Sequence, residues 1–279
     1  WGFVDFNRPM VAINQWEQAA DSMYTLCGKD RIHPSTDGHL VMAYLFLKAQ
    51  GLAGKLVADI RIDGAGKKVT RSDNCRVSDL SVSSDNLTFT YEAKSLPYPI
   101  DTSYYDNEKH TQADALSVIP FMDEMNYEGL SVSGLSDGYY GLTIGGEFIG
   151  RFTARELERG INMALLQNTP QYKQAMKIRQ MNEERWLKER KMREFYWVEY
   201  NLMRKTGMLW ACNEAAVDTL RKYRPHDIFL QWNGDLWLQY MHKGIREDCV
   251  NEQQDLVNQI YEQNKPIPLR IEIKKFTDL

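Results

Sequence analysis

The spacing of apolar positions changes several times along the chain, and each change predicts a new element. Residues 2–7 form a short apolar run that predicts a buried strand, and residues 10–23 carry apolar positions at helical spacing. A second helix is predicted over residues 38–50 and stops at Gly51. Strand, helix, loop and helix in this order are typical of the closing segment of a three-layer α/β domain.

After Gly54 the spacing becomes alternating, as it does in half-buried strands. Residues 55–63 and 77–93 alternate between apolar and polar positions. A polar segment, residues 95–112, follows them and is predicted to be a linker.

Residues 128–152 predict further strands joined by tight turns. The turns are expected at Asp137-Gly138 and at Gly145-Gly146, because such pairs favour hairpin turns. Together with the earlier strands, they predict an antiparallel β module over residues 55–152.

Thr153 opens a predicted helical region. Thr153-Ala-Arg-Glu has the sequence of a capping box, and helical spacing continues to about residue 264 with breaks near Pro170 and Pro225. A short strand, residues 269–273, is predicted to return to the β module.

These patterns divide the chain into three predicted parts of different class. The expected fold is α/β for residues 1–54, an antiparallel β module for residues 55–152, and a helical extension with a terminal strand for residues 153–279.

Composition and charge exclude several classes of protein. The chain has 279 residues, 43% of them hydrophobic and 26% charged, which are ordinary globular values. A net charge of −4 gives no reason to expect nucleic acid or an anionic membrane as a partner. No apolar run approaches the ~18 residues of a membrane helix. The chain opens at Trp1 without a signal peptide, so we expect a processed or incomplete sequence.

The four cysteines lie far apart in the sequence and show no C-x-x-C spacing. A zinc site is therefore not expected. One or two disulfides and four buried free thiols both remain open as interpretations. The cysteines are Cys27, Cys75, Cys212 and Cys249.

The segment Asp30-Arg-Ile-His33-Pro34, followed by Ser-Thr-Asp-Gly-His and a helix, is the strongest candidate for chemistry. An Asp three residues before a His, on a turn that opens a helix, lets the carboxylate reach the imidazole Nδ1. Nε2 is then free to take a proton from a nucleophile.

The segment resembles the last conserved block of the SGNH/GDSL esterase family, D-x-x-H-P-x-x-x-G-H-x-x-M-A. Every fixed position of that pattern is matched, by Asp30, His33, Pro34, Gly38, His39, Met42 and Ala43. The resemblance implies that Asp30 and His33 are the acid and base of a Ser-His-Asp triad. It also implies that residues 1–54 close a three-layer, flavodoxin-like SGNH domain.

The family's nucleophilic Ser, and the Gly and Asn of its oxyanion hole, match nothing at the required position. We therefore expect the nucleophile on a segment upstream of Trp1, and this chain to be inactive alone.

The same segment has a competing interpretation as a metal site. Asp30, His33, Asp37 and His39 have a possible ligand spacing, but the helix start would point His39 away from His33. We favour a backbone hydrogen bond for His39, an N-cap role for Asp37, and no metal ion or other cofactor.

Three other features have structural interpretations that we favour over functional ones. Gly134-Leu-Ser136-Asp-Gly138 matches the nucleophile elbow G-x-S-x-G, but its predicted place between two strands makes Ser136 a turn residue. Asn162 is interpreted as a helix cap rather than a ligand contact. An aromatic set could form a sugar platform, but core and inter-helix packing is the favoured interpretation. Its members are Trp186, Tyr196, Trp197, Tyr200, Trp210, Trp232, Trp237 and Tyr240.

Two functions remain in competition. The first is ester hydrolysis by an SGNH/GDSL-type acylhydrolase or carbohydrate esterase. Its substrate would be an ester, with an acylated carbohydrate as one candidate, and the resemblance implies secretion or a periplasmic location. The second is a non-catalytic module that binds a glycan or docks a partner domain, with the Asp-His pair as a relic.

Overall fold

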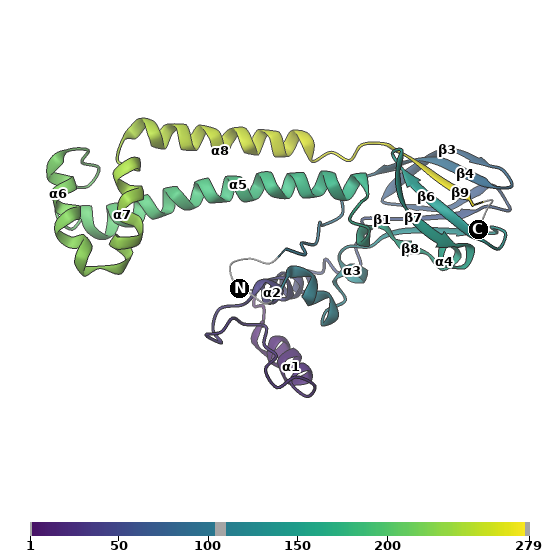
Figure 1. The fold of residues 1–279 in the computed structure, drawn as a ribbon, viewed down its shortest axis with the longest axis horizontal. Helices are drawn as coiled ribbons and strands as arrows, with labels where there is room; N and C mark the ends of the chain where they lie inside the picture. The colour runs from purple at the N-terminus through teal and green to yellow at the C-terminus, as the bar shows by residue number, and fades with distance from the viewer. Residues whose placement is uncertain (1, 104–109, 277–279) are drawn as a thin grey trace. The chain divides into compact units, whose positions relative to one another are not determined.

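The computed structural model describes residues 2–103 and 110–276, which form two compact units (Figure 1). The β-rich unit comprises residues 1–175 and 265–279, and the helical unit comprises residues 176–264. The protein combines α-helices with one mixed and one antiparallel sheet, and its C-terminal half is largely helical. The three-part division at residues 54 and 152 stays a prediction.

The N-terminal segment contains two helices, α1 (Asn7–Glu17) and α2 (Thr36–Ala49). The strand predicted over residues 2–7 is wrong, because residues 2–6 have no regular secondary structure. Asp5 instead accepts a hydrogen bond from the Arg8 amide at 3.2 Å in the first turn of α1. No strand of the described chain pairs with this apolar run, and a strand without a partner leaves its backbone groups unsatisfied.

Among the described residues, nine strands make the two sheets of the β-rich unit. The orders are β2-β1-β5-β8 and β3-β4-β9-β6-β7. The strands are β1 (Ala58–Asp63), β2 (Lys68–Asp73), β3 (Cys75–Val82), β4 (Asn86–Ala93), β5 (Glu128–Ser133), β6 (Tyr139–Ile144), β7 (Glu147–Thr153), β8 (Ile161–Asn162) and β9 (Leu269–Lys275).

The first sheet is mixed, which corrects the prediction of a wholly antiparallel module. β1 and β5 run parallel, from the pair Ala58–Glu128 to the pair Asp63–Ser133. Parallel neighbours need a long connection, and here the chain passes through β2, β3, β4 and two short helices before it reaches β5. Alternation of apolar and polar residues predicts a half-buried strand, but it does not tell whether that strand runs parallel or antiparallel to its neighbour.

Only one of the two predicted turns closes a hairpin. β6 and β7 pair antiparallel around Gly145 and Gly146, whose φ angles are +59° and +85°. The hairpin predicted at Asp137-Gly138 is wrong, because β5 belongs to the first sheet and β6 to the second. The segment between them carries the chain from one sheet to the other.

The C-terminal strand β9 returns to the second sheet, as predicted. It lies between β4 and β6 and pairs antiparallel with both. Its apolar residues Leu269, Ile271 and Ile273 are buried. The last strand of the chain is therefore a central strand of the sheet.

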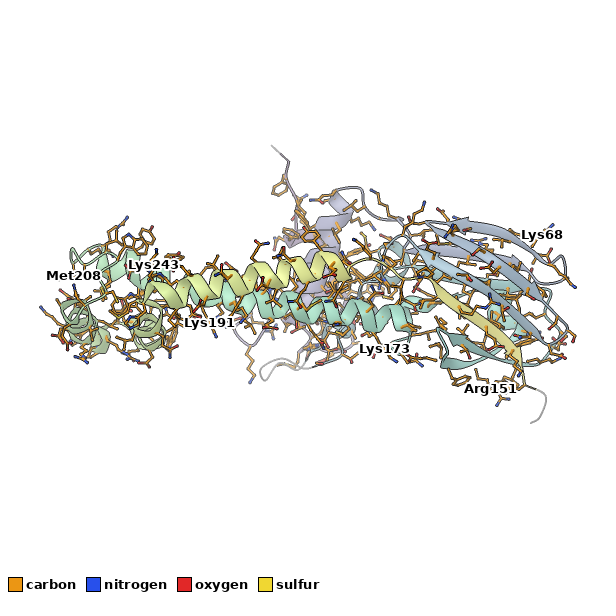
Figure 2. All side chains as sticks on the ribbon, turned by 90° about the horizontal axis from the view of Figure 1, so that it is seen from above. Lys68, Arg151, Lys173, Lys191, Met208 and Lys243 are labelled. Atoms are coloured by element: carbon orange, nitrogen blue, oxygen red, sulfur yellow. The ribbon has the colours of Figure 1, made fainter. Side chains whose placement is uncertain are left out.

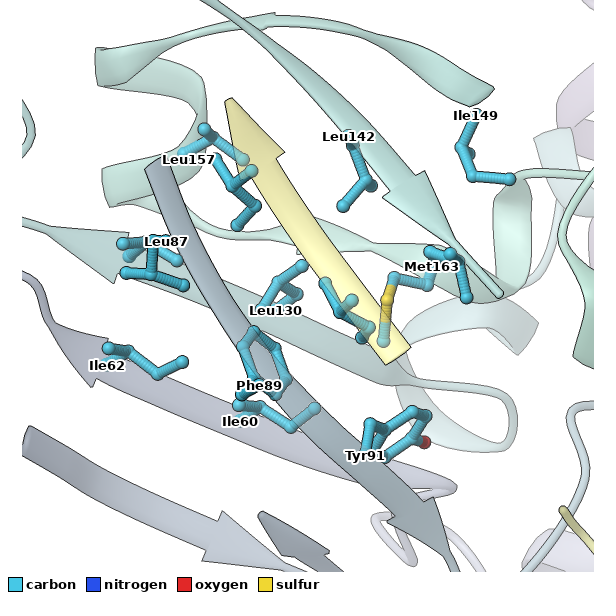
Figure 3. Close-up of a cluster of buried hydrophobic side chains, with 14 of the residues drawn as sticks. Ile60, Ile62, Leu87, Phe89, Tyr91, Leu130, Leu142, Ile149, Leu157 and Met163 are labelled. Carbon is cyan, nitrogen blue, oxygen red and sulfur yellow. The ribbon is translucent and has the colours of Figure 1, made fainter. Parts of the chain in front are cut away.

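Side chains from both sheets share one hydrophobic core (Figure 3). Ile60 and Leu130 come from the mixed sheet, and Phe89 and Leu142 come from the antiparallel sheet. All four are at most 1% exposed, so the two sheets bury a common face.

A second core joins α2 to residues predicted as a linker and to the short helices that follow. These are a 3₁₀ helix, Gln112–Ser117, and α3 (Phe121–Glu124). Leu40 and Val41 of α2 share this core with Ile100, so part of the predicted linker packs inside the protein; residues 104–109 of that linker lie outside the described residues.

The capping box at Thr153 is confirmed and opens α4 (Ala154–Arg159), a short helix of the β-rich unit. The long helix α5 (Pro170–Val198) continues into a π-helical segment, Glu199–Met203.

The helical unit is completed by α6 (Glu214–Tyr223), α7 (Ile228–Tyr240) and α8 (Lys243–Gln263). α5 and α8 run side by side in this unit, and an ion pair of 2.7 Å joins Lys188 to Glu252 (Figures 1 and 2). The break predicted near Pro225 is confirmed between α6 and α7.

Candidate active site

A tight loop before α2 holds the candidate catalytic pair. Its two ends meet at a bridge between Cys27 and Pro34, and the Gly28 amide donates to the His33 carbonyl at 2.7 Å. Arg31 adopts a φ of +60°, an uncommon value for a residue other than glycine. The loop therefore has a defined backbone path that brings Asp30 and His33 to the same side.

Asp30 and His33 form the predicted carboxylate–imidazole contact. His33 Nδ1 lies 2.6 Å from Oδ2 of Asp30. The other carboxylate oxygen accepts hydrogen bonds from the backbone amides of Ile32 and His33, at 2.9 and 3.1 Å. The imidazole contact and these two amides lower the pKa of Asp30 to about 2, so the carboxylate is ionised at neutral pH.

The geometry leaves the other imidazole nitrogen available. The His33 side chain is 82% exposed, and its Nε2 has no hydrogen-bond partner among the described residues. With Nδ1 engaged by Asp30, the neutral imidazole presents an unprotonated Nε2 to the outside. Such a nitrogen can accept a proton from a hydroxyl group and later return it.

Gly38 has a packing role that the motif alone did not reveal. A Cβ atom at this position would lie only 2.0 Å from the carbonyl oxygen of Leu26. The first turn of α2 therefore approaches the loop backbone so closely that only glycine fits. His39 stays on the same turn, where its Nδ1 lies 3.0 Å from the Ser35 carbonyl oxygen, in agreement with the backbone role predicted for it.

Asp37 occupies a different position from the one predicted. Ser35 is the N-cap of α2, and Asp37 lies in the first turn with its side chain 1% exposed. It accepts hydrogen bonds from the Ser35 hydroxyl and from the Gly38 amide. The prediction was wrong because the helix begins earlier than the apolar spacing indicated.

The structure also brings together a second Asp–His pair that the sequence did not reveal. His110 Nδ1 lies 3.4 Å from Oδ2 of Asp37. The two residues are distant in sequence, so no local motif could have identified the pair. The Asp37 carboxylate is buried, whereas the Asp30 and His33 side chains are both exposed to solvent.

The competing metal interpretation does not agree with these positions. Asp37 and His39 bond to groups of the α2 first turn and do not converge on Asp30 and His33. Among the residues that the structure describes, no three His, Cys, Asp or Glu side chains are placed to hold a metal ion.

Ser136 lies between two strands and not at a strand-to-helix turn. Its hydroxyl accepts a hydrogen bond from Lys275 Nζ at 2.7 Å and lies 3.1 Å from the Tyr140 hydroxyl. No described hydrogen bond links it to a histidine. Ser136 therefore lacks the partner of a triad nucleophile in the described chain, and its bonds connect β9 to the segment before β6.

Asn162 caps the 3₁₀ turn Met163–Leu165, as predicted. Its side-chain oxygen accepts from the Ala164 amide at 3.1 Å and from the Glu128 amide at 2.9 Å. Its amide nitrogen donates to the carbonyls of Met122 and Asn126. All of its bonding capacity is used inside the protein.

A buried carboxyl group, Glu128, was missed by the sequence analysis. Its Oε1 accepts from the Tyr91 hydroxyl at 2.8 Å and from Gln171 Nε2 at 3.2 Å. Burial raises the pKa of Glu128 to about 7. A strongly shifted pKa can indicate a functional site, but this side chain has no access to solvent and the role is structural.

The aromatic set of the helical unit is only partly buried. Trp237 and Tyr240 lie in its core, as the packing interpretation predicted. Five others, Trp186, Tyr196, Tyr200, Trp210 and Trp232, are at least 39% exposed and so lie outside the buried core. Tyr196 and Tyr200 nevertheless pack edge-on against Trp210, which agrees with the packing part of the interpretation.

Two further predictions concern the cysteines and membranes. The structure joins no two of the four cysteines by a disulfide, but only Cys75 and Cys249 are buried, whereas Cys212 is exposed. In the part of the chain that the structure describes, we find no helix with the length and hydropathy needed to traverse a bilayer.

Comparison with known proteins gives two similarities. Residues 176–265 match the family described as the diltiazem deacetylase C-terminal helical domain. The chain is also similar to a solved structure described as a gut microbial diltiazem-metabolizing enzyme, with a TM-score of 0.93 and 42% sequence identity. That similarity covers 99% of this chain and 62% of the enzyme. No curated protein sequence matches the chain.

The two similarities agree with each other, because both are to proteins whose descriptions name diltiazem. The chain spans 62% of the length of the solved enzyme.

Proposed function

We propose that this chain is part of a serine ester hydrolase that removes an acetyl or similar small acyl group from an alcohol. The observation that carries the proposal is the exposed Asp30–His33 pair, with Nδ1 bound at 2.6 Å and Nε2 free. The similarity to a diltiazem-metabolizing enzyme, and to the C-terminal helical domain of a diltiazem deacetylase, supports the same reaction class.

In the proposed mechanism, His33 acts as general base and then as general acid. Nε2 takes the proton of a serine hydroxyl while the serine oxygen attacks the ester carbonyl. The tetrahedral intermediate then collapses, the alcohol leaves with the proton from His33, and the acyl group stays on the serine. A water molecule, deprotonated by His33, releases the acid and regenerates the serine.

Asp30 has a positioning role in this mechanism. Its contact with Nδ1 holds the imidazole in one tautomer and stabilises the imidazolium that forms in each step. Because the pKa of Asp30 is about 2, the carboxylate stays ionised over the pH range in which esterases work.

The proposed nucleophile is a serine outside residues 1–279. His33 has no serine among its described hydrogen-bond partners, and the similar enzyme is longer than this chain. On this proposal, the loop and α2 complete an SGNH-type three-layer domain whose other strands lie elsewhere in the protein. The family resemblance also implies that the protein is exported.

The test uses the full protein, including any segment upstream of Trp1, and the chain of residues 1–279 beside it. Diltiazem and 4-nitrophenyl acetate serve as acetyl esters. We expect the full protein to release acetate and the His33→Ala variant to lose at least 10³-fold in kcat. Residues 1–279 alone should show no turnover above the His33→Ala background.

The second Asp–His pair supplies a matched control. His110→Ala removes an imidazole that also contacts an aspartate, and it should keep kcat within a few fold of the wild type. Loss of activity in His110→Ala with retention in His33→Ala would contradict the assignment. Full activity of residues 1–279, abolished by Ser136→Ala, would contradict the proposed nucleophile.

A further inference from the structure

A shallow depression on the helical unit joins two tryptophans of α5 to α7. Its volume is about 280 Å³, and its lining residues are Trp186, Arg190, Arg193, Glu194, Trp197 and Asn233. The α5 members recur at helical spacing and so share one face of the helix. Trp186 is 46% exposed, so the depression is open to solvent.

Aromatic rings extend this depression along α7. Trp197 packs on Phe229 with ring centroids 5.2 Å apart, and Phe229 meets Trp232 at 5.5 Å. Phe229 is 49% exposed and Trp232 is 66% exposed. Large aromatic side chains left in water beside a depression are typical of a binding surface.

The charges lining the depression are paired. Arg190 Nε lies 2.7 Å from Glu194, and Arg193 Nε lies 2.9 Å from Glu189. Glu194 lines the depression and Glu189 does not, but each arginine of the lining has a carboxylate partner, so no unpaired charge lines the depression. Arg193 also lies over the ring of Trp186, at 5.5 Å from the ring centroid, so a cation of the protein itself covers one of the two faces of that ring.

The depression keeps hydrogen-bonding capacity for a ligand. Each arginine uses Nε in its ion pair, and the guanidinium has further N–H donors. The Asn233 side chain has no hydrogen-bond partner among the described residues, so its amide offers a donor and an acceptor. The carboxylate of Glu194 offers acceptors next to them.

We propose that this surface of the helical unit binds a neutral carbohydrate chain. Sugar rings present flat C–H faces that stack on exposed aromatic rings, and their hydroxyl groups both donate and accept hydrogen bonds. They carry no charge, which agrees with a lining whose arginines are each paired with a carboxylate. An open depression of this size fits one part of a longer chain, since it lies just below the roughly 300–1,000 Å³ typical of small-molecule pockets.

This binding site does not depend on ester hydrolysis. It lies wholly within residues 186–233 of the helical unit, whereas the Asp30–His33 pair lies in the β-rich unit. A loss of binding and a loss of catalysis can therefore be produced by separate substitutions and measured separately.

The test measures binding of the full protein to a panel of soluble neutral polysaccharides, such as xylan, glucomannan and arabinan, by affinity electrophoresis and calorimetry. Polygalacturonate is included as a polyanion. We expect a dissociation constant that is measurable for at least one neutral polymer and changes less than twofold between 50 and 500 mM salt. Trp232→Ala and Trp186→Ala should each raise this dissociation constant at least tenfold, and acetyl ester hydrolysis should stay unchanged.

Tyr261→Ala is the matched control, because Tyr261 is an aromatic residue on α8 of the same unit and is 72% exposed. It should bind as the wild type does. Absence of binding to every neutral polymer would overturn the proposal. Three other results would also overturn it. These are salt-sensitive binding to polygalacturonate alone, weakening of binding by Tyr261→Ala as large as that by the tryptophan variants, and self-association of the protein that Trp232→Ala abolishes.

Discussion

The Tyr91 hydroxyl donates a hydrogen bond of 2.8 Å to Glu128 in the interior of the β-rich unit, where neither side chain is more than 1% exposed. Tyr91 comes from β4 of the antiparallel sheet and Glu128 from β5 of the mixed sheet. Gln171, at the start of α5, also donates to the carboxyl group, and its own Oε1 is buried without a partner. A protonated Glu128 could satisfy that oxygen if the Gln171 amide were turned over.

We predict that this carboxyl group makes the protein less stable as pH rises. Burial raises the pKa of Glu128 from 4.5 to about 7, so between these values the native state binds a proton that the unfolded chain has released. The free energy of unfolding must then fall as pH increases through this window. The free energy of unfolding, measured with urea from pH 5 to pH 8, should fall less in Glu128→Gln than in the wild type. The difference between the two falls should be up to ~3 kcal/mol. An identical pH dependence in wild type and variant would contradict the prediction.

Gly38→Ala should disrupt the loop that carries His33. The added Cβ would lie 2.0 Å from the Leu26 carbonyl oxygen, so the loop or the helix must move. Overpacking of this kind costs about 1–3 kcal/mol, and activity in the full protein should fall with the displaced imidazole. Thermal unfolding and kcat are the measurements. Gly244→Ala, where nothing lies within 4 Å of the new Cβ, should leave kcat unchanged and should not lower the unfolding temperature, because alanine is the better helix former in α8.

Asp30→Asn should lower kcat by roughly 10²–10⁴-fold in the full protein, with a much smaller change in KM. The amide removes the charge that stabilises the imidazolium and can hold His33 in the wrong tautomer. Asp21→Asn is the control, since that exposed carboxylate caps the Met23 amide at 2.9 Å and an asparagine oxygen can do the same. Equal kcat values for Asp30→Asn and wild type would show that Asp30 does not position the imidazole.

Glu199→Ala should destabilise the helical unit. The carboxylate, 1% exposed, accepts from Trp237 Nε1 and from the Trp210 amide, both at 2.8 Å. Removing it leaves the indole N–H buried without a partner, which costs roughly 1–3 kcal/mol. Glu199→Gln keeps an acceptor and should lose less.

The measurement for this prediction is urea unfolding followed by tryptophan fluorescence. The control is Glu247→Ala, which breaks an exposed ion pair with Lys243 and should change stability by at most ~1 kcal/mol. A loss in Glu247→Ala as large as that in Glu199→Ala would contradict a specific role for the buried carboxylate.

Features that depend on neighbours in the chain were predictable from the sequence. Asp30 and His33 are three residues apart on one loop, so their contact needs only a local turn. The capping box at Thr153 and the glycine turn between β6 and β7 are local in the same sense. The last strand was predictable because its alternation is strong enough to require a sheet.

The tertiary structure alone decided how those elements combine. Apolar periodicity indicates which face of a strand is buried but not which strand lies beside it. It therefore did not reveal that β1 and β5 are parallel neighbours, or that β5 and β6 belong to different sheets. The Asp37–His110 contact joins residues distant in sequence, and the burial of Glu128 depends on two sheets meeting. Whether an aromatic ring such as Trp232 is buried or exposed depends on the helices packed around it, and these are brought together only when the whole chain folds.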